Sequence, residues 1–223
     1  MLISLYLAML FSLLPLAAVG WLSATPASPT PTTSVVDAAG LAADELTQHA
    51  DETATVAVPL YDVNHREARI FRIARDGTVD EETRTEIQRM FRCKRTEHQH
   101  QIDKGSLAML ADVSSHWPGR TIELVSAYRR TDSRTSRHRQ ARAIDFRIDG
   151  VKMTEVRDYI WASNTELGLG WYPRQNFVHM DHRPGDADYA WTQIGGKERG
   201  GPSWSKRVRR NDVLRVPGSR VGI

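Results

Sequence analysis

Histidine and aspartate side chains gather in two stretches of the sequence, at spacings that suit a metal site. The first, SRHRQARAIDF, places His138 seven positions before Asp145, and the second, FVHMDHRP, contains His179, Asp181 and His182. Two imidazoles and one carboxylate around an open position form the ligand set of a catalytic zinc site. A zinc ion held in this way polarises a carbonyl group and lowers the pKa of bound water to about 7. The two stretches together predict one metal site suited to hydrolysis.

Strand alternation explains how separate stretches can present ligands to one side of a sheet. In RAIDFRI the apolar residues at alternate positions must face the core, so Asp145 points to the opposite face. In FVHMD the residues on either side of His179 are apolar, and His179 therefore points away from them. Two neighbouring strands can present Asp145 and His179 to a shared cleft, which His138 can reach from the preceding loop.

The remaining patterns predict the elements that position these side chains. We expect strands at 68–73, 121–128, 142–148 and 176–181, and helices at 80–92, 105–117 and 155–163. Thr154 is expected to cap the third helix, and GLGWYP at 168–173 is expected to be a loop.

Composition divides the chain into four parts. The first 22 residues carry no charged side chain, and Pro/Thr/Ser-rich and Ala-rich stretches follow them. We expect a signal peptide or membrane anchor at 1–24, a spacer at 25–60, a folded domain at 61–194 and a flexible basic tail at 195–223. The protein is therefore expected to be exported to the periplasm or cell envelope, either free or held by an uncleaved anchor.

Charge is distributed unevenly along the chain. Residues 1–65 contain no Lys or Arg and six acids, and the rest carries 30 basic and 21 acidic side chains, a net charge of +9. A basic body in an exported protein suits an anionic partner, and the basic tail can attract an anionic cell-envelope surface. Nucleic acid is the weaker alternative, because export would separate the protein from it. We expect a monomer.

A competing group of metal ligands lies in CKRTEHQHQ. Cys93, His98 and His100 offer a thiolate and two imidazoles, but the stretch is polar and local and lacks an obvious fourth ligand. Cys93 is the single cysteine of the chain, so an intramolecular disulfide is excluded.

The first stretch resembles the S-x-H-x-x-G-x-A-x-D motif of the D-Ala-D-Ala-carboxypeptidase-like zinc peptidases. That clan includes the lysostaphin-type enzymes and the hedgehog signalling domain. The MepK-type murein endopeptidase branch is more similar, through NHREARI, SAYRR and GLGWYP-x-x-NFVHMDHRPG, over roughly residues 61–192. The resemblance implies an α+β fold with a small central antiparallel sheet and flanking helices. It also implies Zn²⁺ held by His138, Asp145 and His179, and peptide cross-links of peptidoglycan as substrates.

Two positions depart from the family pattern. The glycine of the first motif is Ala141, which is tolerated unless the backbone there needs a positive φ. Some clan members place a glutamate base three residues before the last ligand, where this chain has Asn176. We therefore rank Asp181 first as general base or ligand-orienting group. His182 ranks second, as base or as donor to the developing oxyanion.

Arg129 in SAYRR ends the strand that precedes the metal motif, at a family position. A fixed guanidinium there can bind a carboxylate of diaminopimelate or of a terminal D-Ala. Ser126, Tyr128 and Ser136 are expected to line the same pocket. The Trp-Tyr pair of GLGWYP is either a wall of the cleft or part of the core.

The sequence thus predicts an exported zinc metallopeptidase that hydrolyses peptidoglycan cross-links. Two alternatives stay open at this point. The first is a carboxypeptidase that releases D-Ala. The second is a non-catalytic zinc-containing domain that binds the cell wall, which the missing glutamate at position 176 keeps open.

Overall fold

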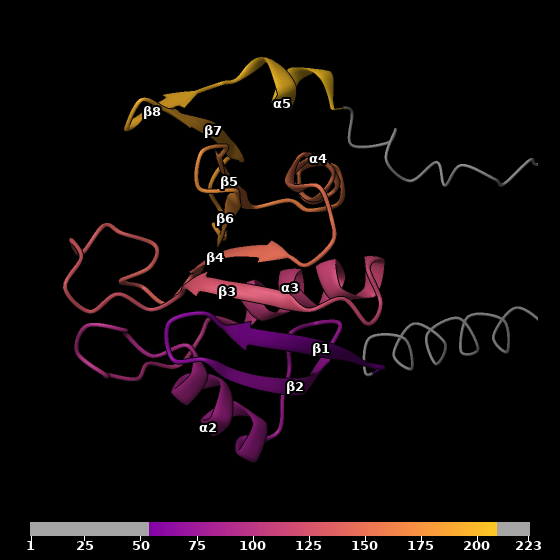
Figure 1. The fold of residues 1–223 in the computed structure, drawn as a ribbon, viewed down its shortest axis with the longest axis vertical. Helices are drawn as coiled ribbons and strands as arrows, with labels where there is room; N and C mark the ends of the chain where they lie inside the picture. Colours follow the sequence, from indigo (N-terminus) through magenta and orange to yellow (C-terminus); the bar gives the residue numbers. More distant parts are fainter. Residues whose placement is uncertain (1–53, 209–223) are drawn as a thin grey trace, which may run out of the picture. The chain divides into compact units, whose positions relative to one another are not determined.

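The computed structural model describes residues 54–208. They form one mixed sheet of eight strands, together with four helices (Figure 1). The strands are β1 (Thr55–Asp62), β2 (Glu67–Ala74), β3 (Ile122–Ser126), β4 (Ala143–Ile148), β5 (Leu167–Tyr172), β6 (Phe177–His182), β7 (Tyr189–Ile194) and β8 (Lys197–Gly200). The helices are α2 (Glu81–Met90), α3 (Lys104–His116), α4 (Met153–Ser163) and α5 (Ser203–Arg207).

The strands follow the order β2-β1-β3-β4-β6-β5-β7-β8 across the sheet. The four central strands, β3, β4, β6 and β5, pair antiparallel with one another. Parallel pairings of β1 with β3 and of β5 with β7 join the flanking strands to this centre. The predicted α+β class is confirmed, and the antiparallel part of the sheet is its centre.

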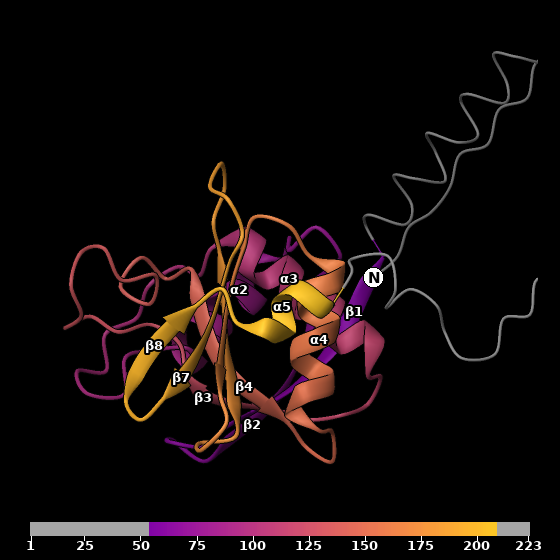
Figure 2. The ribbon, with the colours of Figure 1, turned by 90° about the horizontal axis from the view of Figure 1, so that it is seen from above.

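The helices leave one face of the central strands free. Helices α3 and α4 pack against the strands from the same side (Figure 2). Helix α2 lies beside the edge strand β2 (Figure 1). The apolar residues of β4 and β6, among them Phe146, Val178 and Met180, join one core with these helices. The opposite face of β4 and β6 carries Asp145, His179 and Asp181.

Local capping sets where two of the helices begin. The Asp80 carboxylate accepts a hydrogen bond from the Thr83 backbone N–H at the start of α2, and Asp103 accepts one from Ser106 at the start of α3. The third predicted helix differs from expectation. Helix α4 begins at Met153, one residue before Thr154, and no side chain caps it.

Strand β5 corrects the prediction of a loop at 168–173. Its two glycines let the strand pass close to large or charged side chains. A Cβ at Gly168 would overlap the Asp181 carboxylate, and a Cβ at Gly170 would overlap the indole of Trp191. The glycines are therefore required by packing against β6 and β7, and they do not mark a break in the sheet.

The folded part is longer at both ends than the predicted range of 61–194. Strand β1 begins at Thr55, inside the expected spacer, and pairs along its whole length with β2. Residues 197–207, expected in a flexible tail, form β8 and α5. The predicted signal or anchor, most of the spacer and residues 209–223 lie outside the described range. Within residues 54–208, no helix is both long and apolar enough to cross a membrane.

Replacing Gly168 by alanine should lower the free energy of unfolding by about 2 kcal/mol, because the added methyl group overlaps the buried Asp181 carboxylate. Gly185→Ala is the control. Its Cβ meets open space at a φ of +77°, and the left-handed backbone alone costs about 1 kcal/mol. Urea unfolding of both variants measures the difference, and equal losses would contradict the packing role of Gly168.

Candidate metal centre

Two of the predicted ligands are direct neighbours across the sheet. Asp145 of β4 pairs in register with His179 of β6, as strand alternation predicts. Ser126 of β3 and Gly170 of β5 extend the same row across the sheet. A β-bulge after Leu124 shifts the register of β3 and brings Ser126 opposite Asp145, on the polar face.

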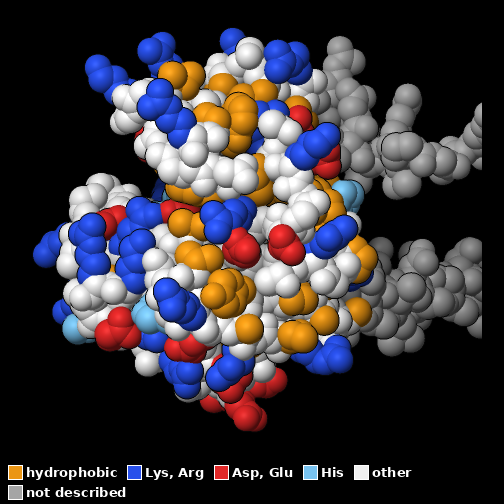
Figure 3. All heavy atoms as spheres, in the orientation of Figure 1, with side chains coloured by type: hydrophobic (Ala, Val, Ile, Leu, Met, Phe, Trp, Pro, Cys, Tyr) orange, Lys and Arg blue, Asp and Glu red, His pale blue; other side chains and the backbone are white. Residues whose placement is uncertain are grey.

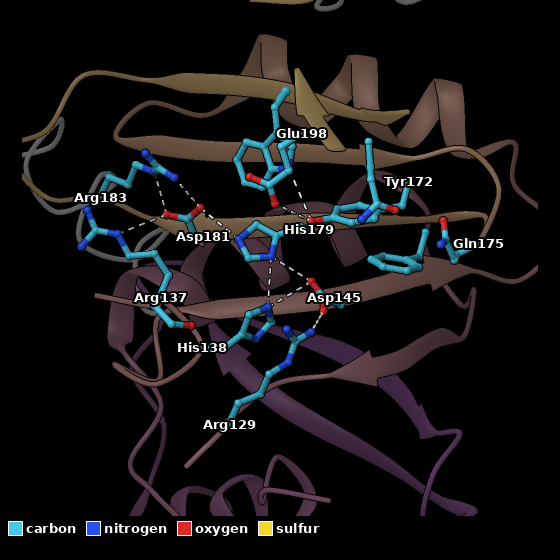
Figure 4. A pocket seen from close by; sticks show the side chains of 14 residues that line it. Arg129, Arg137, His138, Asp145, Tyr172, Gln175, His179, Asp181, Arg183 and Glu198 are labelled. Atoms are coloured by element: carbon cyan, nitrogen blue, oxygen red, sulfur yellow. Dashed lines mark hydrogen bonds and ion pairs between the residues drawn. The ribbon is translucent and has the colours of Figure 1, made fainter. Parts of the chain in front are cut away.

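His138 joins this pair from the loop between β3 and β4, as the close-up shows (Figure 4). Its Nε2 lies 3.1 Å from Nδ1 of His179 and 3.2 Å from Oδ1 of Asp145. The third side of the triangle, His179 Nδ1 to Asp145 Oδ1, is 2.8 Å. All three side chains are buried. The structure thus brings the three predicted ligand atoms to one point.

The remaining ring nitrogen of each histidine is held by an oxygen. Nδ1 of His138 lies 2.6 Å from the carbonyl oxygen of Ala127, and Nε2 of His179 lies 3.0 Å from Oδ2 of Asp181. Such contacts fix which nitrogen carries the proton and leave the other nitrogen free for a metal. The nitrogens directed at a shared metal position are the two that face each other, Nε2 of His138 and Nδ1 of His179.

Opposed charges shape the electrostatics of the group. Burial would raise the pKa of Asp145, but its hydrogen bonds and charge interactions with His138 and His179 outweigh burial and hold that pKa well below its usual range. Burial would lower the pKa of His179, but the hydrogen bonds with Asp145 and Asp181 raise it to about 9. Burial dominates at His138 and lowers its pKa. One proton on His179 therefore occupies the space between the ligand atoms at neutral pH.

Arg129 holds the outer oxygen of Asp145. Its guanidinium donates to Oδ2 of Asp145 and, through Nε, to the Ser126 hydroxyl at 2.8 Å. Oδ1 of Asp145 is thereby left for the ligand triangle. The Arg129 side chain is 37% exposed and also lines the pocket above the triangle, so it faces both the metal ligand and the space for a substrate.

Asp181 lies on the far side of His179 from the triangle. Its carboxylate accepts a bidentate pair of hydrogen bonds from Arg183, at 2.7 and 3.1 Å, and Arg137 lies 3.6 Å away. The side chain is fully buried. An oxygen engaged in this way orients His179 and is poorly placed to take a proton from water above the triangle. Of the two roles predicted for Asp181, the geometry favours the orienting one.

His182 does not reach the site. His182 is two residues after Met180 on β6, so both side chains point to the helix side of the sheet. There Nδ1 of His182 lies 2.6 Å from Asp103 at the start of α3. A Cβ on Gly105 would overlap its ring. The prediction of His182 as a base or oxyanion donor is not supported by this position.

The other predicted pocket residues divide into two groups. Ser136 lines the pocket, whereas Ser126 reaches it only through Arg129. Tyr128 is buried, and its ring lies tilted against that of His100 at 5.0 Å between ring centroids. It lines a separate small pocket and not the one above the candidate metal site.

The two residues that depart from the family pattern, Ala141 and Asn176, both have a positive φ, in the left-handed region. Ala141 has a φ of +56°, so the condition that would favour glycine is met at this buried position. Asn176 has a φ of +54° in the turn between β5 and β6, a conformation that asparagine tolerates well. Its side chain lines a different pocket, and the neighbouring Gln175 lines the site instead.

A pocket of about 540 Å³ lies above the triangle. Sequence reasoning missed several residues that line it, namely Arg137, Gln175, Phe177, Arg183, Trp191, Gln193 and Glu198. Tyr172 forms part of its wall: its hydroxyl donates to Glu198 at 3.4 Å and accepts from the Trp191 indole at 3.4 Å. Burial raises the pKa of Tyr172 to about 12. The wall interpretation of Tyr172 therefore holds, while Trp171 packs against the core.

The competing cluster does not assemble. Cys93 is buried, whereas His98 and His100 are exposed and each contacts a nearby backbone carbonyl through Nδ1. Among residues 54–208, the one group of three or more His, Cys, Asp or Glu that could hold a metal ion is His138, Asp145 and His179.

The triangle has the dimensions of a metal site. In a tetrahedral site with bonds of about 2.0 Å, ligand atoms lie about 3.3 Å apart. The three observed separations, 2.8 to 3.2 Å, are slightly shorter than this, so a small ion fits after a modest expansion. Two neutral nitrogens and one carboxylate oxygen, with an open pocket above, suit a divalent ion that keeps one position for water or substrate.

Comparisons with known proteins place the chain beside one family of peptidases. The family model described as peptidoglycan L,D-endopeptidase MepK matches residues 49–186. The probable peptidoglycan L,D-endopeptidase MepK of Haemophilus influenzae is 31% identical over 109 residues, which cover 43% of this chain and 58% of that protein. The peptidoglycan L,D-endopeptidase MepK of Escherichia coli K12 is 29% identical over 121 residues, covering 48% and 65%. The chain thus spans less than two thirds of these relatives. No solved structure matches the chain.

Metal binding should release a proton and strengthen as the pH rises. The raised pKa of His179, about 9, means that its proton must leave before Nδ1 can bind a metal, so affinity should rise roughly tenfold per pH unit from pH 7 towards pH 9. Calorimetric titration with Zn²⁺ in buffers of different ionisation enthalpy counts the released proton. Asp145→Asn should abolish stoichiometric binding, and His98→Ala should leave it unchanged. Loss of binding in His98→Ala alone would contradict the assignment.

Asp181→Asn should weaken Zn²⁺ binding roughly 10- to 100-fold, as expected for loss of a carboxylate that orients a histidine ligand. The amide keeps the shape of the side chain but not its charge, so the contact with His179 Nε2 becomes weaker. Competition with a chromogenic chelator measures the affinity, with Asp186→Asn, an exposed partner of Arg137, as the control. Unchanged affinity in Asp181→Asn would remove the orienting role.

Proposed function

Because the chain belongs to the MepK family of peptidoglycan L,D-endopeptidases, we propose that it is an exported zinc metallopeptidase that hydrolyses peptide cross-links of peptidoglycan. The observation that carries the proposal is the convergence of His138, Asp145 and His179 beneath an open pocket. The names of the relatives support L,D-peptide bonds as the bonds cleaved.

Zinc is the ion that we propose for the site. Nitrogen and carboxylate ligands with one open position are typical of catalytic zinc. When bound, zinc polarises the scissile carbonyl and activates water. The residues of this chain hold the ligands in place for that chemistry: Asp181 orients His179, and Arg129 and Ser126 orient Asp145.

Substrate binding is proposed to use the arginines of the pocket. Arg129 is partly exposed beside the ligand triangle, and Arg137 and Arg183 lie along the same pocket. Guanidinium groups at fixed positions bind carboxylates in a bidentate manner, and stem peptides of peptidoglycan carry free carboxylates. We propose that Arg129 positions such a carboxylate next to the scissile bond.

The surface charge supports an anionic cell-envelope partner. The segment between β3 and β4 carries six arginines, namely Arg129, Arg130, Arg134, Arg137, Arg139 and Arg142. Lys and Arg side chains gather over the loops on the left of Figure 3, the side on which this segment lies in Figure 1. The charge-free first 22 residues support export to that surface.

Incubation of purified sacculi with the zinc-loaded protein tests the activity. The wild type should convert dimeric muropeptides to monomers, because an endopeptidase cuts cross-links, and His138→Ala should release at least 100-fold less, given that the reaction depends on the metal ligand. His116→Ala is the matched control, since that ring lies against Trp117 and Tyr159 away from the site.

Chromatography of the products also separates the alternatives. Release of D-Ala without loss of dimers would replace the proposal with a carboxypeptidase. Stoichiometric zinc with no turnover on any muropeptide would replace it with a non-catalytic domain that binds the wall.

A further inference from the structure

The far wall of the pocket comes from a segment beyond the family match. The match ends at residue 186, whereas Trp191, Gln193 and Glu198 belong to β7 and β8. Strand β8 pairs antiparallel with β7, and this pairing sets Glu198 directly opposite Gln193. Both side chains line the pocket. Part of the substrate cavity is therefore built by residues of the C-terminal hairpin.

This hairpin is held firmly by the short helix that follows it. Trp204 of α5 is buried, and its indole N–H donates to the Thr192 hydroxyl of β7 at 2.8 Å. The guanidinium of Arg157 on α4 lies between the rings of Trp171 and Trp204, 4.5 and 4.6 Å from their centroids. The backbone N–H of Gly201 donates to Ala190 at 3.0 Å. These contacts fix the position of β8 relative to the central strands.

Glu198 is the acidic group of the pocket that has no cation as partner. Three carboxylates line the pocket, and two of them are paired with arginine: Asp145 with Arg129, and Asp181 with Arg183. Within residues 54–208 no ion pair involves Glu198, and its carboxylate accepts a hydrogen bond from the Tyr172 hydroxyl at 3.4 Å. A carboxylate held in this way keeps free lone pairs for a ligand donor.

The charges of the pocket are separated in space. Figure 4 shows Glu198 on the opposite side of the pocket from Arg129, with His179 between them. Arg137 and Arg183 lie to one side, near Asp181. A ligand that spans the pocket would meet positive charge at one end and a negative carboxylate at the other. That arrangement fits a group carrying both a carboxylate and an ammonium.

We propose that Glu198 binds the free ammonium group of a diamino acid in the substrate peptide, while an arginine of the opposite wall binds the carboxylate on the same or a neighbouring carbon. This inference rests on the proposed function and deepens it by naming the substrate chemistry. Glu198 is thus a specificity-determining residue, and Tyr172 positions its carboxylate.

A role for Glu198 as the general base is the competing interpretation. A general base used by the whole family should lie within the stretch that the family shares. That stretch ends at residue 186, and Glu198 lies twelve residues beyond it. Glu198 is also exposed on an edge strand, and its contact is with Tyr172 and not with any of the three ligands. A position on the rim suits recognition of a substrate group, and a base would alter turnover of every substrate equally.

The test uses two substrates that differ in one group. One is a synthetic L,D-cross-linked stem-peptide dimer with a free side-chain ammonium, and the other is the same dimer acetylated at that nitrogen. Glu198→Gln should raise KM for the first roughly tenfold, the loss expected for one charge-assisted hydrogen bond, and leave KM for the second and both kcat values unchanged. Glu198→Asp should fall between wild type and Glu198→Gln. Glu155→Gln, an exposed change on α4 outside the pocket, is the charge-matched control.

Calorimetry on the metal-free full-length protein provides a readout that is independent of turnover. The monomeric tripeptide with a free ammonium should bind more tightly than its acetylated form, and Glu198→Gln should abolish that preference. Equal effects of Glu198→Gln on both substrates, a fall in kcat for both, or equal binding of both tripeptides would overturn the inference. Absence of cleavage by the wild type would count against the proposed function, and the binding preference would then still decide the role of Glu198.

Discussion

The site depends on the register between β4 and β6. Asp145 and His179 face each other only because these strands pair at those two positions. Since successive side chains of a strand point to opposite faces, a slip of one residue would send His179 into the core and bring Val178 or Met180 to the polar face. The apolar residues on the helix side of both strands prevent such a slip, because Ile144, Phe146, Val178 and Met180 are buried in the core. The packing of the core therefore fixes the strand register, and the register in turn sets Asp145 opposite His179.

Burying this group of charges has a cost that neighbouring side chains offset. Two carboxylates, two imidazoles and their arginine partners lie in or beside a buried row, and unpaired charges there would be strongly destabilising. Each oxygen of Asp145 and Asp181 has a hydrogen-bond partner in the structure. The two carboxylates raise the pKa of His179, so His179 carries a proton on Nδ1 inside the ligand triangle, at the place where a metal ion would supply the positive charge instead. The site is therefore arranged for a cation whether or not that cation is a proton.

Sequence patterns predicted the parts of the site that follow from strand periodicity and failed where tertiary packing decides. The facing of Asp145 and His179 follows from alternating apolar residues, and the same alternation places His182 on the helix side, against its predicted role. The two glycines of β5 led to the prediction of a loop. They are needed because large side chains of neighbouring strands lie against them, and no local sequence pattern reveals such contacts. Glu198 was missed because a basic, weakly apolar segment gave no periodic signal for a strand.

The pocket is lined by residues of central strands and by residues of the edge strand β8, and these two groups differ in how freely their side chains can be substituted. Two of the three ligands, Asp145 and His179, stand on central strands that pair with a strand on each side, so a substitution there alters packing across the sheet. Strand β8 is an edge strand, exposed along its length, and depends on the core only through the contacts of β7 and Trp204. Its side chains can change without disturbing the ligands. The geometry of the ligands can therefore stay constant while residues at the rim of the pocket change.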